Sequence, residues 1–444
     1  MKKLLTLAIF LAACSYASAD ELTVFRCGDG IPGIDEPQLM GLGISPQGKY
    51  VCGAIEKGAG IFVANVETGE VKWTIPEGDE GGELRHVDDN GLSIGVSDRG
   101  ILFSFDSGLV TDLVVPEGTR YILGEDLTNS GKMLVGSLSQ ESFRTYGAYT
   151  YDAENWTILP LPTKQELGSA AGRVPEGSAA KMVSADGKVI YGALGSYTLP
   201  MLWVMNDKGE FESDFFIARY LADGIDPNRP VYGVNAIYGL SLSNNGRYAT
   251  FLGAILDEES DVPGTTRTVP MVYDVQEKEL KIYSEKQPID EYQAGLWPIA
   301  IADDGTFIGT IGMAFYDQFG SFIMKAGETV AETYLEAFPA YAEKYSVGDY
   351  LGFNQPCAIS ASGRYILGYI YYCEDYNDAY ADDYYETYII DRGEDSAVNE
   401  ISSEEVNAVP EAIYSIDGKR LSKMTKGLNI IRMSDGSARK VINK

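Results

Sequence analysis

A single histidine limits the chemistry open to this chain of 444 residues. His86 stands in the expected strand 84–87, and because it is the one histidine, metal sites built from several histidines are excluded. A Ser-His-Asp triad would have to use His86, and no Gly-x-Ser-x-Gly elbow supports one. Walker loops, dinucleotide fingerprints, EF-hand loops and Cys-x-x-Cys pairs do not occur. We expect His86 to be a hydrogen-bonded strand residue, and we expect no cofactor.

Carboxylates are the remaining groups that could do chemistry. A glycosidase or lyase that works through Asp and Glu therefore stays open as an alternative. The aspartates Asp88, Asp186, Asp303 and Asp304 lie in short turns, where Asp is expected because it bonds nearby backbone, so we interpret them as structural. Segment 374–386 is the densest in acids and tyrosines. It could hold Ca²⁺ or offer tyrosine faces to a ligand, but our default interpretation is a solvated loop.

The charge balance argues against nucleic acid as a partner. Asp and Glu number 65 against 35 Lys and Arg, which gives a net charge of -30. Such a chain repels phosphate backbones and anionic lipid. With 45% hydrophobic residues, the composition is otherwise that of a folded protein with a large core.

The N-terminus predicts export. Lys2 and Lys3 precede an apolar run over residues 4–13, and Ala-Ser-Ala follows at 17–19, which is the pattern of a secretory signal peptide over residues 1–19. A rival interpretation is a lipoprotein signal in which Cys14 is lipidated. We favour cleavage before Asp20. No later window approaches the roughly 18 apolar residues that a spanning helix needs, so we expect no transmembrane segment.

One short phrase recurs seven times: an apolar strand, a polar turn ending in Gly, and a second apolar strand. In such turns Ser, Asp or Asn bonds nearby backbone and Gly takes the positive-φ position, so each phrase predicts a β-hairpin. The copies are ISPQGKYVCG (44–53), VDDNGLSIG (87–95), LTNSGKMLVG (127–136), VSADGKVIYG (183–192), LSNNGRYATF (242–251), IADDGTFIG (301–309) and ISASGRYILG (359–368).

The spacing of these hairpins predicts an all-β, seven-bladed β-propeller over residues 20–395. A further apolar strand follows most copies, and four antiparallel strands at a period of roughly 40 to 60 residues match a propeller blade. In the last copy the strand 386–391 is followed by a polar run, so this blade lacks its fourth strand. The orphan strand 22–26 would supply it and close the ring. His86 would then face either the packed interior or the axial channel.

Four cysteines remain after the signal peptide. The closure would place Cys27, Cys357 and Cys373 near one rim of the last blade, where a disulfide or buried free thiols are equally compatible with the sequence. Cys52 lies within a strand, and we expect it to be a free core residue.

The repeats resemble two groups of bacterial proteins. The Ser-Pro-x-Gly-Lys turn resembles TolB-type propeller repeats, and the phrase at 183–192 with the later Leu202-Trp203 resembles the extracellular HAF repeats. Neither resemblance implies an enzymatic activity; both suggest binding or scaffolding.

The tail resembles a type IX secretion sorting domain of the Bacteroidota kind. The phrases AIYSIDGKRL (412–421) and KGLNIIR (426–432) and the basic terminus carry this resemblance. It implies a small C-terminal β-sandwich at 411–444, after an acidic linker at 396–410, that is read by outer-membrane secretion machinery. Two hairpins with turns at Asp417-Gly418 and Asp435-Gly436 agree with it. An alternative is a final pair of strands packed on the propeller.

We expect ligands to bind at one rim of the propeller, through the longer loops at 163–179, 222–236, 256–268, 285–297 and 338–356. These loops carry aromatic, Arg and amide side chains, although for Trp297, beside Pro298, we favour packing. The candidate ligand-binding residues are Arg173, Arg229, Tyr232, Asn235, Tyr292, Trp297, Tyr350, Phe353 and Asn354. The leading hypothesis is a secreted or cell-surface binding module for a glycan, peptide or protein; the alternative is a carboxylate-dependent glycan-cleaving enzyme with its site in the axial channel.

Overall fold

The computed structural model divides into two compact units, Met1–Ala397 and Val398–Lys444. Parts of both units are described. The described residues are 20–25, 38–55, 60–76, 82–96, 100–113, 116–119, 121–139, 147–152, 155–167, 177–195, 199–222, 229–235, 239–285, 287, 295–313, 317–345, 352–373, 383–393, 410–415, 419–421, 423, 427–433 and 438–443.

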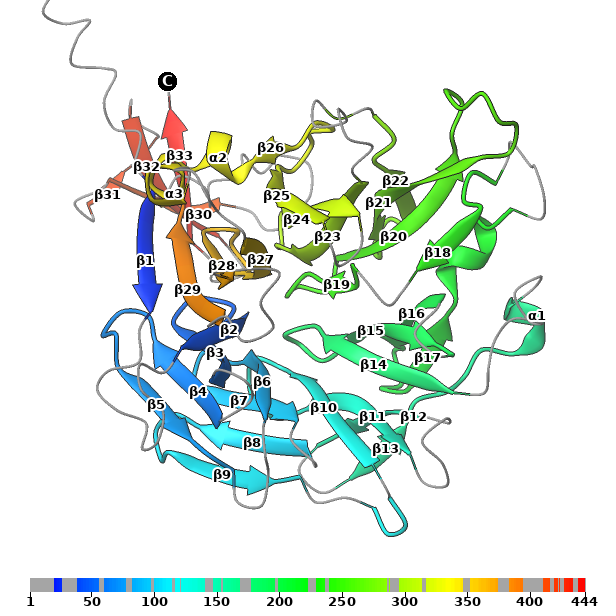
Figure 1. Ribbon diagram of the computed structural model, residues 1–444. Coiled ribbons are helices and arrows are strands. Elements are labelled where there is room, and N and C mark those ends of the chain that lie inside the picture. The colour runs from blue at the N-terminus through cyan, green and yellow to red at the C-terminus, as the bar shows by residue number, and fades with distance from the viewer. Residues whose placement is uncertain are drawn as a thin grey trace, which may run out of the picture. The chain divides into compact units, whose positions relative to one another are not determined.

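The first unit is a seven-bladed β-propeller, and its blades follow one another around a central axis (Figure 1). Each blade is an antiparallel sheet, and in the first six blades the strands run outward in sequence order. The first three blades are β2 (Leu39–Ile44), β3 (Tyr50–Ile55), β4 (Gly60–Asn65) and β5 (Val71–Thr74); β6 (Glu83–Val87), β7 (Leu92–Val96), β8 (Gly100–Ser104) and β9 (Leu109–Asp112); and β10 (Tyr121–Leu127), β11 (Leu134–Ser139), β12 (Gly147–Tyr151) and β13 (Trp156–Ile158).

Blades four to six continue the pattern, with one departure in the fifth. There two short strands, β18 and β19, both pair with β20 and together take the inner position. The strands are β14 (Ser178–Val183), β15 (Val189–Leu194), β16 (Leu199–Met205) and β17 (Phe211–Asp214); β18 (Gly233–Asn235), β19 (Ser241–Leu242), β20 (Tyr248–Leu256), β21 (Thr266–Asp274) and β22 (Glu279–Ile282); and β23 (Gly295–Ile301), β24 (Phe307–Met313), β25 (Asp317–Met324) and β26 (Glu332–Thr333).

The seventh blade joins the two ends of the propeller. Its inner strands are β27 (Gly352–Ile359), β28 (Tyr365–Cys373) and β29 (Asp383–Asp391), and its outer strand is β1 (Glu21–Phe25) from the start of the described chain. β1 pairs antiparallel with β29, from Glu21 opposite Asp391 to Phe25 opposite Thr387. The pairing predicted for the orphan N-terminal strand is therefore confirmed, and it covers an edge that β29 would otherwise expose.

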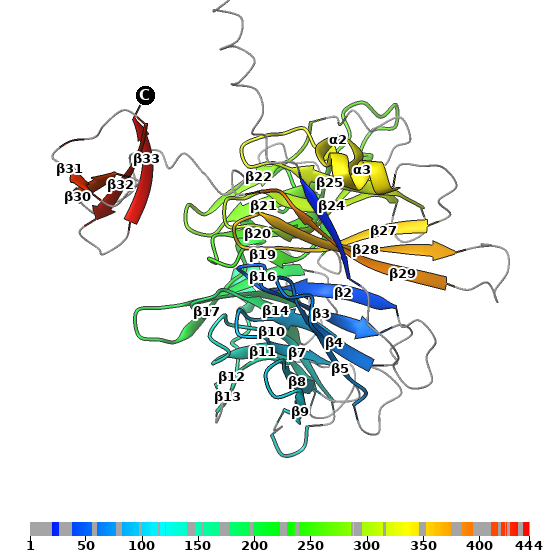
Figure 2. The ribbon, with the colours of Figure 1, turned by 90° about the vertical axis from the view of Figure 1, so that its left-hand side faces the viewer.

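Short helices lie outside the blade pattern. The helix α1 (Lys164–Leu167) follows the third blade, and a 3₁₀ turn, η3 (Phe216–Arg219), follows the fourth. The helices α2 (Tyr334–Ala337) and α3 (Pro339–Tyr345) lie beside the last two blades (Figure 2). Within the described residues, no helix has the length and apolar character needed to cross a bilayer.

The seven hairpin turns adopt the geometry that their sequences predict. In the first, the Ser45 hydroxyl oxygen accepts hydrogen bonds from the backbone N–H groups of Lys49 and Tyr50, at 2.9 and 3.1 Å. Gly48 closes this turn with a φ of 72°, a conformation that a side chain would strain. The turn glycines of the other six blades, Gly91, Gly131, Gly187, Gly246, Gly305 and Gly363, also have positive φ.

Neighbouring turns are hydrogen-bonded to one another around the axis. At six of the seven blade junctions a backbone N–H of one turn donates to an oxygen of the turn in the next blade. The pairs are Gln47 N to Asp89 Oδ1 at 2.8 Å, Asp89 N to Asn129 Oδ1 at 3.1 Å, Ala185 N to Asn244 O at 2.7 Å, Asn245 N to Asp303 Oδ1 at 2.7 Å, Asp303 N to Ala361 O at 2.9 Å, and Ala361 N to Pro46 O at 2.9 Å. These bonds fix one end of the axial channel.

The turn aspartates are structural, as predicted. Asp88 Oδ1 accepts from the backbone N–H groups of Asn90 and Leu92, and Asp303 Oδ1 accepts from Asn245 in the adjacent blade. Asp186 and Asp304 likewise bond within their own turns. The carboxylates of these hairpins are therefore engaged in holding backbone.

The core consists of apolar layers between adjacent blades. Trp203, Tyr149, Tyr191 and Phe62 are fully buried, and the tyrosine hydroxyls reach backbone carbonyl oxygens: Tyr191 donates to Thr250 O at 2.9 Å. Cys52 is a buried free thiol, which confirms that prediction.

The second unit contains an antiparallel sheet in the order β31-β30-β32-β33. Its strands are β30 (Pro410–Ser415), β31 (Arg420–Leu421), β32 (Gly427–Met433) and β33 (Ala438–Asn443). A single sheet is described there, so the two-layered sandwich stays a prediction. The expected hairpin turns at Asp417-Gly418 and Asp435-Gly436 also lie outside them.

Candidate functional site

A β-bulge recurs at the same place in the inner strands and lets consecutive residues reach the axis. In β2, β6, β10, β14, β23 and β27 the pairing register shifts by one residue, always at the residue six positions before the turn glycine. In the fifth blade Leu240, between β18 and β19, stands at that position. A bulge breaks the alternation of side chains between the two faces of a strand. Two adjacent residues, such as Arg85 and His86, therefore both line the channel.

Aligning the blades on their turn glycines arranges the channel walls in three layers of seven residues. All of these residues except Val87 line one axial cavity. The bulge layer is Leu42, Arg85, Glu125, Lys181, Leu240, Ile299 and Cys357. The middle layer is Gly43, His86, Asp126, Met182, Ser241, Ala300 and Ala358. The aliphatic layer, nearest the turns, is Ile44, Val87, Leu127, Val183, Leu242, Ile301 and Ile359.

Blades two to four supply a charged wall. Glu125 accepts from Arg85 Nη1 through Oε2 and from Lys181 Nζ through Oε1, each at 2.5 Å. Arg85 also bonds Glu83, with Nε 2.7 Å and Nη2 2.6 Å from Oε1. Burial alone would lower the pKa of Arg85, but the charges of Glu125 and Glu83 outweigh it and raise that pKa. Three bulge-layer residues from consecutive blades thus form a plus-minus-plus row.

A second polar pair lies one layer deeper. His86 Nδ1 is 2.8 Å from Asp126 Oδ1. Asp126 Oδ2 accepts from the backbone N–H of Val183 at 2.8 Å, which joins the third blade to the fourth. Burial opposes protonation of His86, but the charge and hydrogen bond of Asp126 outweigh it, so the pKa of His86 lies above its ordinary value.

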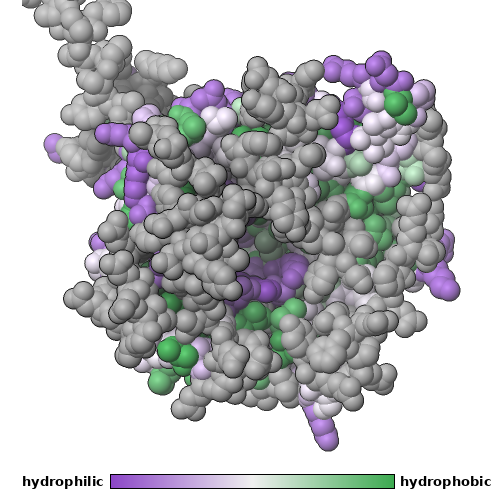
Figure 3. Space-filling model, viewed as in Figure 1, coloured by the Kyte–Doolittle hydropathy of each residue, from purple (hydrophilic) through white to green (hydrophobic). Residues whose placement is uncertain are grey.

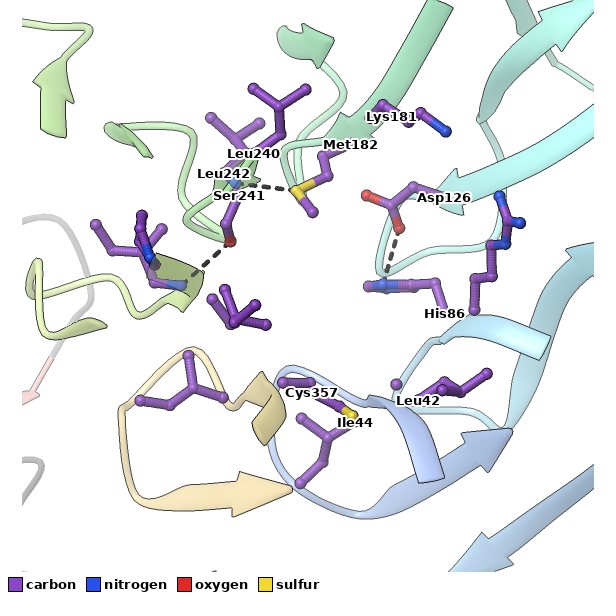
Figure 4. Close-up of a pocket in the computed structure, with 18 of the residues that line it drawn as sticks. Leu42, Ile44, His86, Asp126, Lys181, Met182, Leu240, Ser241, Leu242 and Cys357 are labelled. Atoms are coloured by element: carbon purple, nitrogen blue, oxygen red, sulfur yellow. Dashed lines mark hydrogen bonds and ion pairs between the residues drawn. The ribbon is translucent and has the colours of Figure 1, made fainter. Parts of the chain in front are cut away.

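The opposite wall is mainly aliphatic and includes Ser241. Figure 4 shows His86, Asp126 and Lys181 on one side of the pocket, Leu240 and Leu242 across from them, and Ile44 and Cys357 along another side. Viewed along the axis, hydrophilic residues gather at the bottom of the central hollow with hydrophobic residues beside them (Figure 3). The cavity has a volume of about 690 Å³. That is within the range of roughly 300 to 1,000 Å³ typical of small-molecule sites.

Cys357 lies on this wall as a free thiol, so it forms no disulfide with Cys27 or Cys373. Burial raises the pKa of the Cys357 thiol. The side chains of Cys27 and Cys373 lie outside the described residues. Among the residues that the structure describes, no group of three or more His, Cys, Asp or Glu side chains is arranged to hold a metal ion.

Few of the nine rim residues predicted from sequence can be placed as side chains. Arg229 donates to the backbone oxygen of Leu221 at 3.2 Å, and Tyr232 is half-buried beside β18. Arg173, Tyr292 and Tyr350 lie outside the described residues, as does segment 374–382 of the acidic run. The backbones of Asn235 and Phe353 lie in β18 and β27, but their side chains are not described.

The structure corrects the placement of two rim candidates. Trp297 lies in β23 and lines the axial cavity, so it belongs to the channel wall. Asn354 lies in β27, where its amide contacts the hydroxyl of Tyr341 and its Oδ1 accepts from Tyr388 at 2.7 Å. It is therefore locked between α3 and the last blade. The segment 338–356, expected to be a loop, contains the helix α3. The side chains of Tyr341 and Tyr345 on this helix are buried in the core.

Sequence reasoning missed the charged row and the His86–Asp126 pair. His86 was expected to face the interior or the channel, and the structure places it in the channel, but Arg85, Glu125, Asp126 and Lys181 were not singled out. The signal was available: reading the sixth and fifth residues before each turn glycine gives the bulge and middle layers directly.

Comparison with known proteins supports the fold. No family model matches this sequence, and no curated protein matches it. An oligogalacturonate lyase from Vibrio parahaemolyticus superposes with a TM-score of 0.51 and 12% identity, over 85% of this chain and 98% of that one. An oligogalacturonate lyase in complex with manganese superposes with a TM-score of 0.50 and 10% identity, over 85% of this chain and 98% of that one. TolB from Acinetobacter baumannii has a TM-score of 0.36 and 13% identity, over 68% of this chain and 64% of that one. At such identities the likeness to the two lyases concerns the propeller fold alone.

Proposed function

We propose that this protein is an exported binding module whose propeller holds a small ligand in the axial cavity. The observation that carries the proposal is the cavity itself, about 690 Å³ in volume and lined by all seven blades, with a charged wall facing an apolar one. Concave sites with a mostly apolar lining and a few convergent polar groups are the usual form of ligand sites. This moves the binding site from the rim loops to the channel.

Binding is favoured over catalysis because the carboxylates in the cavity are already engaged. A carboxylate-dependent glycosidase needs one acid with a proton to donate and a second carboxylate facing the substrate. Both oxygens of Glu125 accept from cations, and both oxygens of Asp126 accept from His86 or backbone. Neither side chain is free to take part without breaking these bonds.

An occluding substitution tests this proposal. We would measure the thermal stabilisation of the full-length protein by aliphatic carboxylates, apolar peptides and oligosaccharides, then repeat the measurement with Ala358→Trp, which places an indole in the middle layer. Val262→Trp, at an exposed loop position, is the matched control. Compounds that stabilise the wild type and the control should fail to stabilise Ala358→Trp. Equal stabilisation of all three proteins would place the binding site elsewhere.

The second candidate is an enzyme, and the His86–Asp126 pair favours it. A carboxylate that orients an imidazole is the arrangement of a general base. Two solved structures with this fold are oligogalacturonate lyases. To decide between a binding module and an enzyme, we would incubate the protein with oligogalacturonate and measure the absorbance of unsaturated products. We expect no product; turnover that Asp126→Asn abolishes would establish the enzyme.

We also propose that the second unit directs export across the outer membrane. Support comes from its separation as a compact unit of antiparallel strands and from its basic residues, among them Lys419, Arg420 and Lys423. A reporter fused to residues 396–444 should appear on the cell surface of a bacterium with type IX secretion. Retention of that reporter in the periplasm would contradict the proposal.

A further inference from the structure

On the polar wall of the axial cavity, the basic side chains are more exposed than the carboxylates that they bind. The side chains of Glu125 and Asp126 are 5% and 7% exposed, whereas those of Arg85, His86 and Lys181 are 31%, 27% and 23% exposed. The carboxylates therefore lie behind the nitrogens that they bind. At this wall a bound molecule therefore meets the nitrogens of Arg85, His86 and Lys181 more than the carboxylate oxygens.

Two of these side chains keep donors beyond the bonds already described. Arg85 uses Nε, Nη1 and Nη2 once each on Glu83 and Glu125, and a guanidinium has five N–H groups. His86 bonds Asp126 through Nδ1, so its Nε2 is the second donor when the ring is protonated. Figure 4 shows this ring directed toward the middle of the pocket. Planar N–H pairs of this kind suit a carboxylate.

Much of the remaining lining suits a hydrocarbon chain, and the polar residues Ser241, Asn244, Thr310 and Gln355 also line the cavity. Ile44, Leu242, Ile301 and Ile359 line the floor, and Leu240 and Ile299 stand above them. These side chains offer no hydrogen-bond partner, so the hydroxyls of a sugar ring buried against them would be left unsatisfied at a cost in free energy. An alkyl chain has no such groups and gains from leaving water.

We infer that the ligand of the axial cavity is an aliphatic carboxylate, with its head at Arg85 and His86 and its chain against the aliphatic layer. This rests on the proposed function and names its ligand class. Two sources share this chemistry: a free fatty acid and the C-terminus of an apolar peptide. In both, the carboxylate contacts the second-blade residues, and the chain points toward the turns that end the channel.

The charged neighbours of His86 set the pH dependence of this binding. Glu83, Arg85, Asp88 and Asp89 lie on the same blade, Glu125 and Asp126 on the third, and Lys181 on the fourth. Protonation of His86 adds one positive charge to this acid-rich cluster and a donor for the head group. Carboxylate affinity should therefore fall as pH rises through the folded-state pKa of His86, which lies above the ordinary value, because the ring then loses its proton and its second donor.

Calorimetric titration of the full-length protein with hexanoate, octanoate and decanoate tests the inference. Each added methylene should tighten binding by about fourfold, the equivalent of roughly 0.8 kcal/mol per buried CH₂. Octylamine, with the same chain and the opposite charge, should not bind. Acetyl-leucyl-isoleucine with a free carboxylate, compared with its amide, distinguishes the peptide source: tighter binding of the free peptide than of octanoate identifies a C-terminus.

Paired variants locate the two ends of the ligand. His86→Gln should abolish the pH dependence and weaken octanoate binding about tenfold, and Ile359→Asn should remove the gain per methylene. Lys188→Met and Ile158→Asn, at exposed positions in a turn and an outer strand, should bind as the wild type does. Absence of carboxylate binding, or equal binding of octylamine, would overturn the ligand class. If another compound bound instead and Ala358→Trp blocked its binding, the proposal of a ligand site in the axial cavity would be retained.

Discussion

The imidazole of His86 and the carboxylate of Asp126 meet at 2.8 Å across the boundary between the second and third blades. Each comes from the middle layer of the axial cavity, and each reaches the axis because a bulge precedes it in its strand. The pair joins two blades and also faces the cavity, so its protonation affects both stability and binding.

The first prediction concerns this pair and pH. The pKa of His86 is raised in the folded state, so its bond with Asp126 stabilises the fold fully below the ordinary pKa of histidine, about 6.5. That stabilisation is lost as pH rises through the folded-state pKa. Urea unfolding of the wild type and His86→Gln should show the largest difference in free energy near pH 5.5 and a smaller one at pH 9. A difference that does not vary with pH would contradict the assignment.

The second prediction concerns the buried carboxylate of the charged row. Glu125→Gln leaves Arg85 and Lys181 facing each other without the anion between them, and should lower the free energy of unfolding by about 3 kcal/mol. Glu83→Gln, at a more exposed position, should cost less than about 1 kcal/mol. Replacing the row together, as Arg85→Met, Glu125→Leu and Lys181→Met, should recover most of the loss. Equal effects of Glu125→Gln and Glu83→Gln would show that burial of Glu125 is not what matters.

The third prediction concerns ring closure. Deleting residues 20–25 removes β1 and its five pairs with β29. At a net value of about 1 kcal/mol for each backbone hydrogen bond, the propeller should lose several kcal/mol and still unfold in one transition. Deleting residues 398–444, which form a separate unit, is the control and should leave that transition in place. An unchanged melting temperature after the first deletion would refute the closure role.

The fourth prediction concerns the two described free thiols. Burial raises the pKa of Cys52 and of Cys357, so neither forms the reactive thiolate at pH 8. Peptide mass spectrometry after iodoacetamide treatment should show both thiols unmodified in the folded protein and modified in urea. Rapid alkylation of folded Cys357 would show that the cavity wall is more open than described.

The hairpins and the ring closure could be predicted because local chemistry determines them. Gly48 and its six counterparts need positive φ, and Ser45 bonds its own turn, so each hairpin is encoded within a few residues. The orphan strand could be assigned because the last blade lacked a partner. Both inferences use short-range patterns that can be recognised in a single sequence.

The site could not be predicted in the same way, because it depends on contacts between blades. Glu125 and Lys181 are 56 residues apart, and nothing local pairs them. Strict alternation along a strand would place Glu125 and Asp126 on opposite faces; the bulge brings both to the axis. Trp297 and Asn354 were placed in the longer loops 285–297 and 338–356, yet both lie in inner strands.

The most direct test of the axial site is a crystal structure of the protein with the tightest ligand from the stabilisation screen. We predict ligand density inside the channel, with a polar group near Arg85 and His86 and an apolar part against Ile359 and Leu242. Density at the outer loops, with only water in the channel, would contradict the central claim.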